Sequence, residues 1–271
     1  MSGAPFRDNV VVLTGASAGI GHQLALQLAA QGARLVLAAR DATKLEETAA
    51  ACRALGAAAI AVPTDVGDEA RCKALVERAV AEYGRIDTLV NNAGIGMWAR
   101  FDEMTDLSPF ERIMRVNYLG SVYPTFYALP HLKKTRGRIV SVNSLTGRTG
   151  VPTRSGYAAS KHAAAGFFDT IRIELDGTGV TVTQVFPGFV ATEIRERAFG
   201  PDGLPLGEGN SPVREAEVMT AEECARQTLA AAAARKRELI MTLRGKIGAR
   251  LKLLAPALVD RIAAKAIARG K

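Results

Sequence analysis

Short apolar runs alternate with longer amphipathic stretches along most of the chain. In the stretches between the runs, apolar residues such as Leu24 and Leu28 recur at helical spacing. Continuous apolar strands separated by helices are typical of a parallel sheet that is covered on both faces. The pattern therefore predicts an α/β fold in which one doubly wound parallel sheet is flanked by helices.

The predicted elements follow one another closely until the chain passes residue 200. Strands are expected at Val10–Leu13, Arg34–Ala39, Ala58–Val62, Thr88–Val90, Arg138–Val142, Val180–Phe186 and Glu238–Met241. Helices are expected at Gly19–Gln31, Thr43–Leu55, Glu69–Tyr83, Ser108–Thr135 and Ser155–Gly177. Gly200–Pro212 holds four glycines and three prolines, so we interpret it as a mobile loop and not as a domain linker.

Length and charge divide the chain unevenly. Its 271 residues fit one large catalytic domain, residues 1–242, followed by a basic extension, residues 243–271. Between Arg235 and Lys271 there are eleven Lys or Arg and two Asp or Glu, a net +9 that leaves −1 of the total +8 for the other residues. Because the main domain is nearly neutral, we do not expect a nucleic-acid partner.

The three cysteines, Cys52, Cys72 and Cys224, are odd in number and have no metal-ligand spacing. A disulfide framework and a metal site are therefore not expected, and the composition favours a cytoplasmic protein. The first apolar run is too short for a signal peptide, and no run reaches the roughly 18 residues of a spanning helix. We expect attachment to a membrane surface at most.

Glycines recur in a GxxxGxG pattern directly after the first strand, at Gly15, Gly19 and Gly21. A helix begins there, and its free N–H groups and partial positive charge suit a pyrophosphate. Glycine lets the backbone approach such a ligand closely. A plain glycine-rich turn is the alternative, which the position between an apolar strand and an amphipathic helix disfavours. Ser17 and Ile20 of the same turn are expected to contact the cofactor.

With Thr14 before it, this spacing resembles the short-chain dehydrogenase/reductase family, whose fold is of the Rossmann type. Other family markers follow in order from about Asn9 to Thr192. Asp65-Val66 resembles the adenine contact, and Asn91-Asn92-Ala93-Gly94 resembles the NNAG motif that braces the sheet and lines the cofactor. Asn117 resembles the helix asparagine that supports a water-linked proton path. Pro187-Gly188 resembles the PG motif, Thr192 the threonine that contacts the carboxamide, and Val190 the backbone that orients the nicotinamide.

A YxxxK pair and a preceding serine complete the resemblance. Tyr157 and Lys161 are four residues apart, which places both side chains on one face of a helix, and Ser144 precedes Tyr157 by the thirteen residues that the family requires. A tyrosine donates its proton more readily where a neighbouring ammonium favours the phenolate. The resemblance implies that Tyr157 is the acid/base and that Ser144 orients the substrate oxygen. Lys161 would favour the phenolate and bind the nicotinamide ribose, and Asn117 would support the relay.

The residue after the second strand indicates which cofactor binds. An acidic residue there would bind a ribose 2′-hydroxyl, whereas arginine pairs with a 2′-phosphate and stacks on adenine. Arg40 occupies this position and favours NADP(H) over NAD(H). NAD(H) stays the alternative, because Asp41 follows and Ala18 stands where the family's second basic marker would be.

The substrate is expected to lie against mostly apolar segments. These contain Met97, Trp98, Leu145, Val151, Phe189 and Phe199. They suit a hydrophobic carbonyl compound such as a steroid, fatty or aromatic ketone. The alternative is that these residues close the core or a subunit contact.

The extension from Leu243 to Arg269 has apolar residues every three or four positions, basic residues between them, and a break at Pro256. A basic amphipathic helix can lie on an anionic membrane, and membrane-associated steroid and lipid reductases of the family have similar extensions. The alternative is a helix over the substrate entrance or a partner subunit.

Together these features predict an oxidoreductase that transfers a hydride between NADP(H) and a carbonyl or secondary alcohol. The resemblance also implies a homodimer or homotetramer joined through the two long helices. The rival hypothesis is a nucleotide-sensing regulatory or binding protein on the same scaffold. Such proteins usually lose the Tyr or the Lys, and both are present here.

Overall fold

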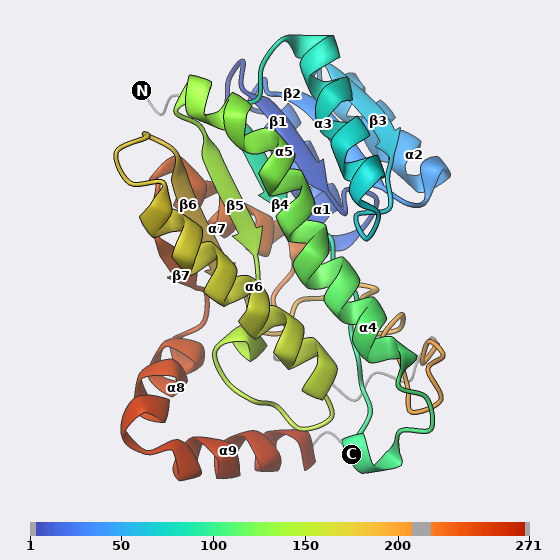
Figure 1. Cartoon of the computed structure of the whole chain (residues 1–271), viewed down its shortest axis with the longest axis vertical. Helices are drawn as coiled ribbons and strands as arrows, with labels where there is room; N and C mark the ends of the chain where they lie inside the picture. The colour runs from blue at the N-terminus through green and yellow to red at the C-terminus, as the bar shows by residue number, and fades with distance from the viewer. Residues whose placement is uncertain (1–3, 208–217, 269–271) are drawn as a thin grey trace.

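A single parallel sheet forms the centre of the computed structural model, which describes residues 4–207 and 218–268. Its strand order is β3-β2-β1-β4-β5-β6-β7, and every neighbouring pair is parallel (Figure 1). The strands are β1 (Val10–Thr14), β2 (Arg34–Ala39), β3 (Ala59–Pro63), β4 (Thr88–Asn91), β5 (Arg138–Val142), β6 (Thr181–Phe186) and β7 (Glu238–Ile240). This confirms the predicted Rossmann-type fold, and the order reverses between β1 and β4, where such sheets bind ligands.

Helices cover both faces of the sheet. One face carries α1 (Gly19–Ala29), α2 (Ala42–Ala54) and α7 (Ala221–Ala233). The other carries α3 (Glu69–Tyr83), α5 (Gly120–Thr135) and α6 (Ser155–Glu174), with α4 (Ser108–Met114) beyond α5. Strand β2 shows how the sequence fills both layers, since Leu35 and Leu37 point to the first and Val36 and Ala38 to the second. A strand buried on both sides must be apolar throughout.

The helix expected over Ser108–Thr135 is interrupted. A π-helical turn, Arg115–Leu119, joins α4 to α5 and contains Asn117. A π turn inserts one residue into a helix and often marks a functional site. The apolar pattern continues on both sides of the turn, so periodicity alone predicts an unbroken helix.

Helix α7 has no counterpart among the expected elements. Its sequence is rich in alanine, which gives little contrast between an apolar and a polar face. A local signal is present nevertheless, because Thr220 caps the helix by accepting the Glu223 N–H at 3.1 Å. A Thr followed three residues later by Glu is the sequence signature of a capped helix start.

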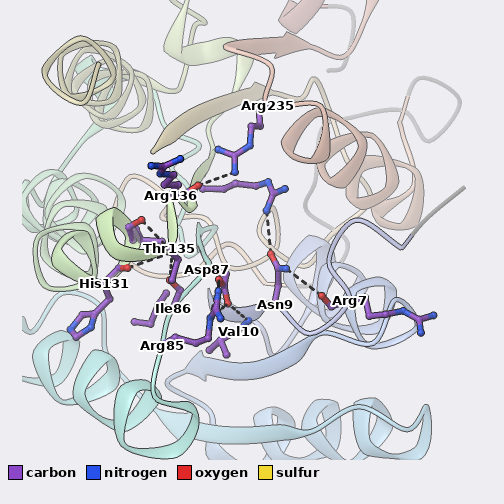
Figure 2. Close-up of polar contacts among 12 residues, drawn as sticks. Arg7, Asn9, Val10, Arg85, Ile86, Asp87, His131, Thr135, Arg136 and Arg235 are labelled. Carbon is purple, nitrogen blue, oxygen red and sulfur yellow. Dashed lines mark hydrogen bonds and ion pairs between the residues drawn. The ribbon is translucent and has the colours of Figure 1, made fainter. Parts of the chain in front are cut away.

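Paired polar groups close the edge of the sheet where the strands begin (Figure 2). The Asp87 carboxylate accepts the Val10 N–H at 2.9 Å and pairs with the Arg85 guanidinium at 2.5 Å. Arg235 donates to the Arg136 carbonyl at 2.8 Å, and the Thr135 hydroxyl donates to the Ile86 carbonyl at 2.8 Å. These bonds tie the starts of β1, β4 and β5 together.

Two helices follow β7, α8 (Leu243–Leu254) and α9 (Pro256–Ala268), with the break at the predicted Pro256. They lie beyond the edge where the strands end, apart from the layers on the sheet faces (Figure 1). No helix within residues 4–207 and 218–268 is long and apolar enough to cross a membrane. The division into domains 1–242 and 243–271 stays a prediction. Of the expected loop Gly200–Pro212, Gly200–Gly207 forms turns and residues 208–212 lie outside the described residues.

Candidate active site

One continuous cavity of about 1310 Å³ opens at the edge where the strands end. Pockets for one small ligand are usually roughly 300–1,000 Å³, so this cavity has room for a cofactor and a substrate together. The predicted residues that line it are Gly15, Ser17, Gly19, Ile20, Arg40, Asp65, Val66, Ala93, Gly94, Ser144, Tyr157, Lys161, Pro187, Gly188, Val190 and Thr192.

The glycine turn leaves no room for side chains. Gly15 and Gly19 have φ angles of +66° and +53°, a region that L side chains rarely adopt. A Cβ on Gly21 would lie 2.0 Å from the Gly15 carbonyl oxygen, and one on Gly19 would lie 2.9 Å from the Thr192 methyl group. Gly21 therefore packs the turn and does not line the cavity. The turn precedes the N–H groups at the start of α1, and these two features fit a dinucleotide pyrophosphate.

The NNAG segment is fixed to the glycine turn. The Thr14 hydroxyl accepts the N–H groups of Asn92 and Ala93 at 3.0 and 3.1 Å, and the Asn92 amide donates to the Thr14 and Gly15 carbonyls at 3.1 Å. A Cβ on Gly94 would lie 3.7 Å from Lys161 Nζ, so the missing side chain keeps this lysine open to the cavity.

Two predicted asparagines brace the site from behind. Asn91 is buried and donates to the Thr125 hydroxyl at 3.0 Å, which joins β4 to α5. The Asn117 side chain accepts the Ile95 N–H at 2.8 Å and donates to the Ile95 carbonyl and the Ser160 hydroxyl, both at 3.0 Å. Neither residue lines the cavity, so the Asn117 side chain positions the NNAG segment against α6. Its part in a proton path stays a prediction.

Tyr157 and Lys161 lie together on the buried side of α6. Their exposed fractions are 8% and 5%, and Lys161 Nζ lies 5.7 Å from the centre of the Tyr157 ring. Lys161 donates to the Val142 carbonyl at the end of β5, at 3.1 Å. This single backbone bond fixes the ammonium while its other protons stay available. The helical spacing thus brings a phenol and an ammonium to the same wall of the cavity.

Ser144 approaches the same cavity from the end of β5. Its hydroxyl oxygen accepts the Thr146 N–H at 3.2 Å, and its own N–H donates to the Asn143 side chain at 2.9 Å. The Asn143 amide in turn donates to the Lys161 carbonyl at 3.2 Å. No acceptor for the Ser144 O–H is found in the described part of the chain, so this proton can be donated to a ligand oxygen.

At the adenine end, Arg40 is exposed at the rim of the cavity. The neighbouring Asp41 carboxylate caps α2 and accepts the Lys44 N–H at 3.1 Å. The Asp65 carboxylate accepts the Gly67 N–H at 2.9 Å, and Val66 is buried against Gly120. One oxygen of Asp41, the residue that favoured NAD(H) in the sequence, therefore caps α2.

At the opposite end, the segment after β6 closes over the cavity. The Leu145 N–H donates to the Pro187 carbonyl at 3.0 Å, and Val190 forms a parallel bridge with Met219. Thr192 reaches back to the glycine turn at Gly19. The predicted nicotinamide contacts thus line one wall, which is hydrogen-bonded to the segment that carries Ser144.

The apolar residues expected around a substrate divide into two groups. Leu145, Val151, Phe189 and Phe199 line the cavity. Met97 and Trp98 do not, which corrects the expectation for both. Met97 is fully buried in a cluster with Tyr157 and Phe199, and Trp98 lies beneath a guanidinium.

Sequence reasoning missed Arg154, three residues before Tyr157, whose side chain lines the cavity. A basic residue at the position where a helix usually has a Ser, Thr, Asp or Asn cap is the signal that could have found it. The extension also contributes to the site, in the way that the alternative of a helix over the substrate entrance expects. The residues of α8 and α9 that line the cavity on its inner side are Gly245, Gly248, Ala249, Val259 and Ala263.

The cysteines lie apart from this cavity and are all buried and free. Burial raises the pKa of Cys52 to about 11 and that of Cys72 and Cys224 to about 12, because the thiolate would lose its water. At neutral pH these thiols are protonated and poor nucleophiles. Within residues 4–207 and 218–268, no group of three or more His, Cys, Asp or Glu could hold a metal.

Comparisons with known proteins agree with this geometry. A family model described as short chain dehydrogenase matches residues 9–201. An 11-beta-hydroxysteroid dehydrogenase of Pinus massoniana is 39% identical over 85% of this chain and 66% of its own length, and 11-beta-hydroxysteroid dehydrogenase-like 4A of Arabidopsis thaliana is 46% identical over 67% and 60%. The chain thus spans somewhat less than two thirds of these curated relatives.

A solved structure extends the agreement to the fold. It is a short chain dehydrogenase/reductase from Burkholderia phymatum in complex with NAD, with a TM-score of 0.81 and 27% identity over 94% of this chain and 96% of that one. The resemblance in the motifs, the match over residues 9–201 and the shared fold lead to one conclusion: the chain belongs to the short-chain dehydrogenase family of oxidoreductases.

Proposed function

We propose that the protein is an NADP(H)-dependent oxidoreductase that interconverts a hydrophobic carbonyl compound and its secondary alcohol. The observation that carries this proposal is the joint placement of Tyr157, Lys161 and Ser144 in the cavity that also contains the glycine turn. The relatives named 11-beta-hydroxysteroid dehydrogenases support a reaction at CH–OH or C=O.

The residues present fit a dinucleotide. The glycine turn would hold the pyrophosphate, Asp65 and Val66 would flank the adenine, and the segment from Pro187 to Thr192 would flank the nicotinamide. When bound, the cofactor supplies or accepts the hydride. The structural neighbour from Burkholderia phymatum holds NAD, which supports binding of this cofactor class.

Arg40 supports NADP(H) as the preferred form. Its guanidinium lies at the rim where a 2′-phosphate would project, and such a phosphate suits a planar fork of N–H donors. The competing carboxylate of Asp41 already accepts a backbone N–H at the start of α2. One Asp41 oxygen is thus used at the start of α2, whereas the Arg40 guanidinium lies at the cavity rim and can pair with a 2′-phosphate.

During reduction the Tyr157 hydroxyl donates its proton to the substrate oxygen, and during oxidation the phenolate accepts it. The Ser144 hydroxyl, whose oxygen accepts the Thr146 N–H, donates its own proton to the same substrate oxygen. The Lys161 ammonium, fixed by Val142, stabilises the phenolate that remains. The apolar walls and the inner side of α8 and α9 exclude water from these groups.

The extension has a second, outward-facing side, which we propose lies on an anionic membrane surface. Val259 and Ala263 face the cavity, whereas Leu253 and Leu254 are 84% and 86% exposed. Exposed leucines beside basic residues such as Lys252 and Arg250 suit an anionic bilayer. The leucines would contact the acyl chains and the basic residues the negatively charged headgroups. A lipid surface next to the cavity would supply apolar substrates directly.

We also propose a homodimer or homotetramer joined through α5 and α6. Phe126 on α5 is 68% exposed and Ile173 on α6 is 73% exposed. Apolar side chains that stand out from two adjacent long helices favour burial against a second copy. Light scattering on the purified protein tests this directly, with a monomer contradicting it.

The test of the proposed reaction measures cofactor binding and turnover separately. NADPH and NADH are titrated by fluorescence, and both are then offered with a panel of hydrophobic ketones and alcohols. We expect tighter NADPH binding and turnover of at least one panel member. Binding of NADPH without any turnover would favour a nucleotide-sensing protein, and absence of binding to either nucleotide would overturn the proposal.

A further inference from the structure

Arg154 occupies a position that the local structure disfavours for a cation. It lies at the amino-terminal end of α6, on the side of the molecule where α8 and α9 lie (Figure 1). A cap residue there normally accepts a backbone N–H, but Arg154 makes no such bond with its side chain. The positive end of the helix dipole also repels a cation, and the first turn of α6 holds no acidic residue. A residue that breaks local rules in this way often serves the function.

Aromatic rings hold the Arg154 guanidinium beside the catalytic tyrosine. Its central carbon lies 4.0 Å from the centre of the Trp98 ring, 5.5 Å from that of Phe189 and 5.8 Å from that of Tyr157. The attraction of a cation to the faces of aromatic rings is not a hydrogen bond to an N or O acceptor. The rings therefore hold the guanidinium in place without satisfying its N–H donors.

No partner satisfies those donors in the part of the chain that the structure describes. Arg154 Nε is fully shielded from solvent and has no acceptor, and no side-chain hydrogen bond or ion pair of Arg154 is found among the described residues. Burial is the largest of the effects that together lower the pKa of Arg154 to about 10; Tyr157 raises it and Arg195 lowers it to smaller extents, so the group is poorly solvated yet still charged at neutral pH. A poorly solvated cation without a partner destabilises the fold unless an anion binds to it.

Arg148, another arginine of the same cavity, provides a comparison because it has partners within the chain. It also lines the cavity and stacks on a ring, 4.4 Å from the centre of Phe186. Unlike Arg154, it is paired with two carboxylates, Glu238 and Asp169, the latter at 3.6 Å. The chain therefore pairs Arg148 with its own acids and leaves Arg154, next to Tyr157, without an acidic partner among the described residues.

We propose that Arg154 binds a carboxylate group of the substrate, so that the enzyme acts on apolar carbonyl or alcohol compounds that carry a carboxylate close to the reacting carbon. This inference rests on the proposed function. A carboxylate matches the parallel donors of a guanidinium, and Leu145, Val151 and Phe189 supply the apolar walls around the rest of the molecule. Proximity of Arg154 to Tyr157 requires the anion and the carbonyl to be only a short chain apart.

The first test uses binding and stability, which do not depend on turnover. Binding of benzoylformate, benzoylpropionate and benzoylbutyrate is measured by calorimetry, with and without NADP⁺, beside the methyl ester of each. We expect at least one acid to bind the wild type on the order of a hundredfold more tightly than its ester. Arg154→Met should remove that preference, because it keeps the apolar stem but loses the charge.

The melting temperature of the ligand-free protein separates a binding role from a structural one. If Arg154 is an unpaired, desolvated cation, Arg154→Met should leave the melting temperature unchanged or raise it by about 2–4 °C. The matched control Arg148→Met should lower it, because Glu238 and Asp169 would lose their partner. A loss of stability in Arg154→Met equal to that in Arg148→Met would overturn the proposal.

Kinetics with the same acid and ester pairs completes the test. We expect kcat/KM for the preferred acid to fall on the order of a hundredfold in Arg154→Met, with the ester changed little. Arg154→Lys should recover only part of the loss, because an ammonium lacks the fork. If the wild type binds acid and ester with equal affinity, this inference is overturned. The proposed function would still hold in that case, provided that the enzyme turns over neutral ketones with NADPH. Failure to bind NADPH would instead overturn the proposed function.

Discussion

The polar groups labelled where the strands begin differ from the reactive groups of the cavity in their partners, although Thr88 Oγ1 and Arg138 Nε, at the starts of β4 and β5, also lack partners among the described residues. Where the strands begin, Asp87, Arg235 and Thr135 all have partners within the chain (Figure 2). Where the strands end, the Ser144 hydroxyl and the Arg154 guanidinium lack acceptors among the described residues, and Lys161 uses one of its three protons. Paired groups stabilise a fold, whereas unpaired ones in a cavity are available to a ligand. Substitutions at the two edges should therefore change different quantities.

The largest effect is expected at Tyr157. Tyr157→Phe removes the proton donor and keeps the ring that packs against Met97 and Phe199. We expect kcat to fall by about 10²–10⁴-fold while NADPH binds with unchanged affinity. The control is Tyr127→Phe, which removes an exposed hydroxyl that donates to Glu69 at 2.8 Å and should leave turnover intact. Equal activity of Tyr157→Phe and the wild type would show that another group moves the proton.

At the opposite edge, Asp87→Ala should change stability and leave chemistry alone. It deprives the buried Val10 N–H of its acceptor and the Arg85 guanidinium of its partner. We expect the free energy of unfolding to drop by about 1–3 kcal/mol, measured by urea denaturation. Asp87→Asn keeps an acceptor oxygen for Val10 and should lose less. A fall in kcat per folded molecule in either variant would contradict this separation of the two edges.

The sequence predicted some parts of the molecule more closely than others, for physical reasons. The glycine turn could be predicted closely, because backbone φ angles and close approaches at Gly15, Gly19 and Gly21 permit only one residue type. Tyr157, Lys161 and Ser144 could be predicted because a helix and a strand fix their spacing. The strands followed from burial on both faces, which leaves an unbroken apolar run.

The substrate end was predicted less well, for physical reasons. Met97 and Trp98 are apolar, but composition does not tell a residue that lines a cavity from one packed behind it. Arg154 could not be recognised from the sequence because its unusual feature is the absence of a nearby carboxylate. Whether a carboxylate lies nearby depends on tertiary contacts. The sequence of the extension predicted its helical pattern and the break at Pro256. It could not predict which residues face the cavity, because that depends on how α9 packs against the rest of the molecule.

A third substitution tests which nucleotide the rim at Arg40 selects. Arg40→Ser should lower the ratio of kcat/KM for NADPH to that for NADH about tenfold or more, since a charge-assisted bond to the 2′-phosphate is lost. Lys44→Ser, in the first turn of α2, is the control. Lys44 is already paired with Glu193 at 3.6 Å, so its loss should leave the ratio unchanged. A preference for NADH in the wild type would reject the role proposed for Arg40.

The smallest effect on folding stability is expected at Leu253 and Leu254. Substitutions there also test whether the outer side of the extension binds a membrane. Both side chains are more than four-fifths exposed, so replacing both by Ser should change the free energy of unfolding by less than about 0.5 kcal/mol each. Binding to anionic vesicles, followed by co-sedimentation, should nevertheless weaken about tenfold or more, because the apolar contact with lipid is lost. Phe126→Ser is the control, since it removes an exposed apolar group from α5 instead of α8. It should shift the protein toward monomer without changing vesicle binding. Failure of the wild type to sediment with anionic vesicles would overturn the proposed membrane contact. Equal sedimentation of the double Ser variant and the wild type would show that Leu253 and Leu254 do not make that contact.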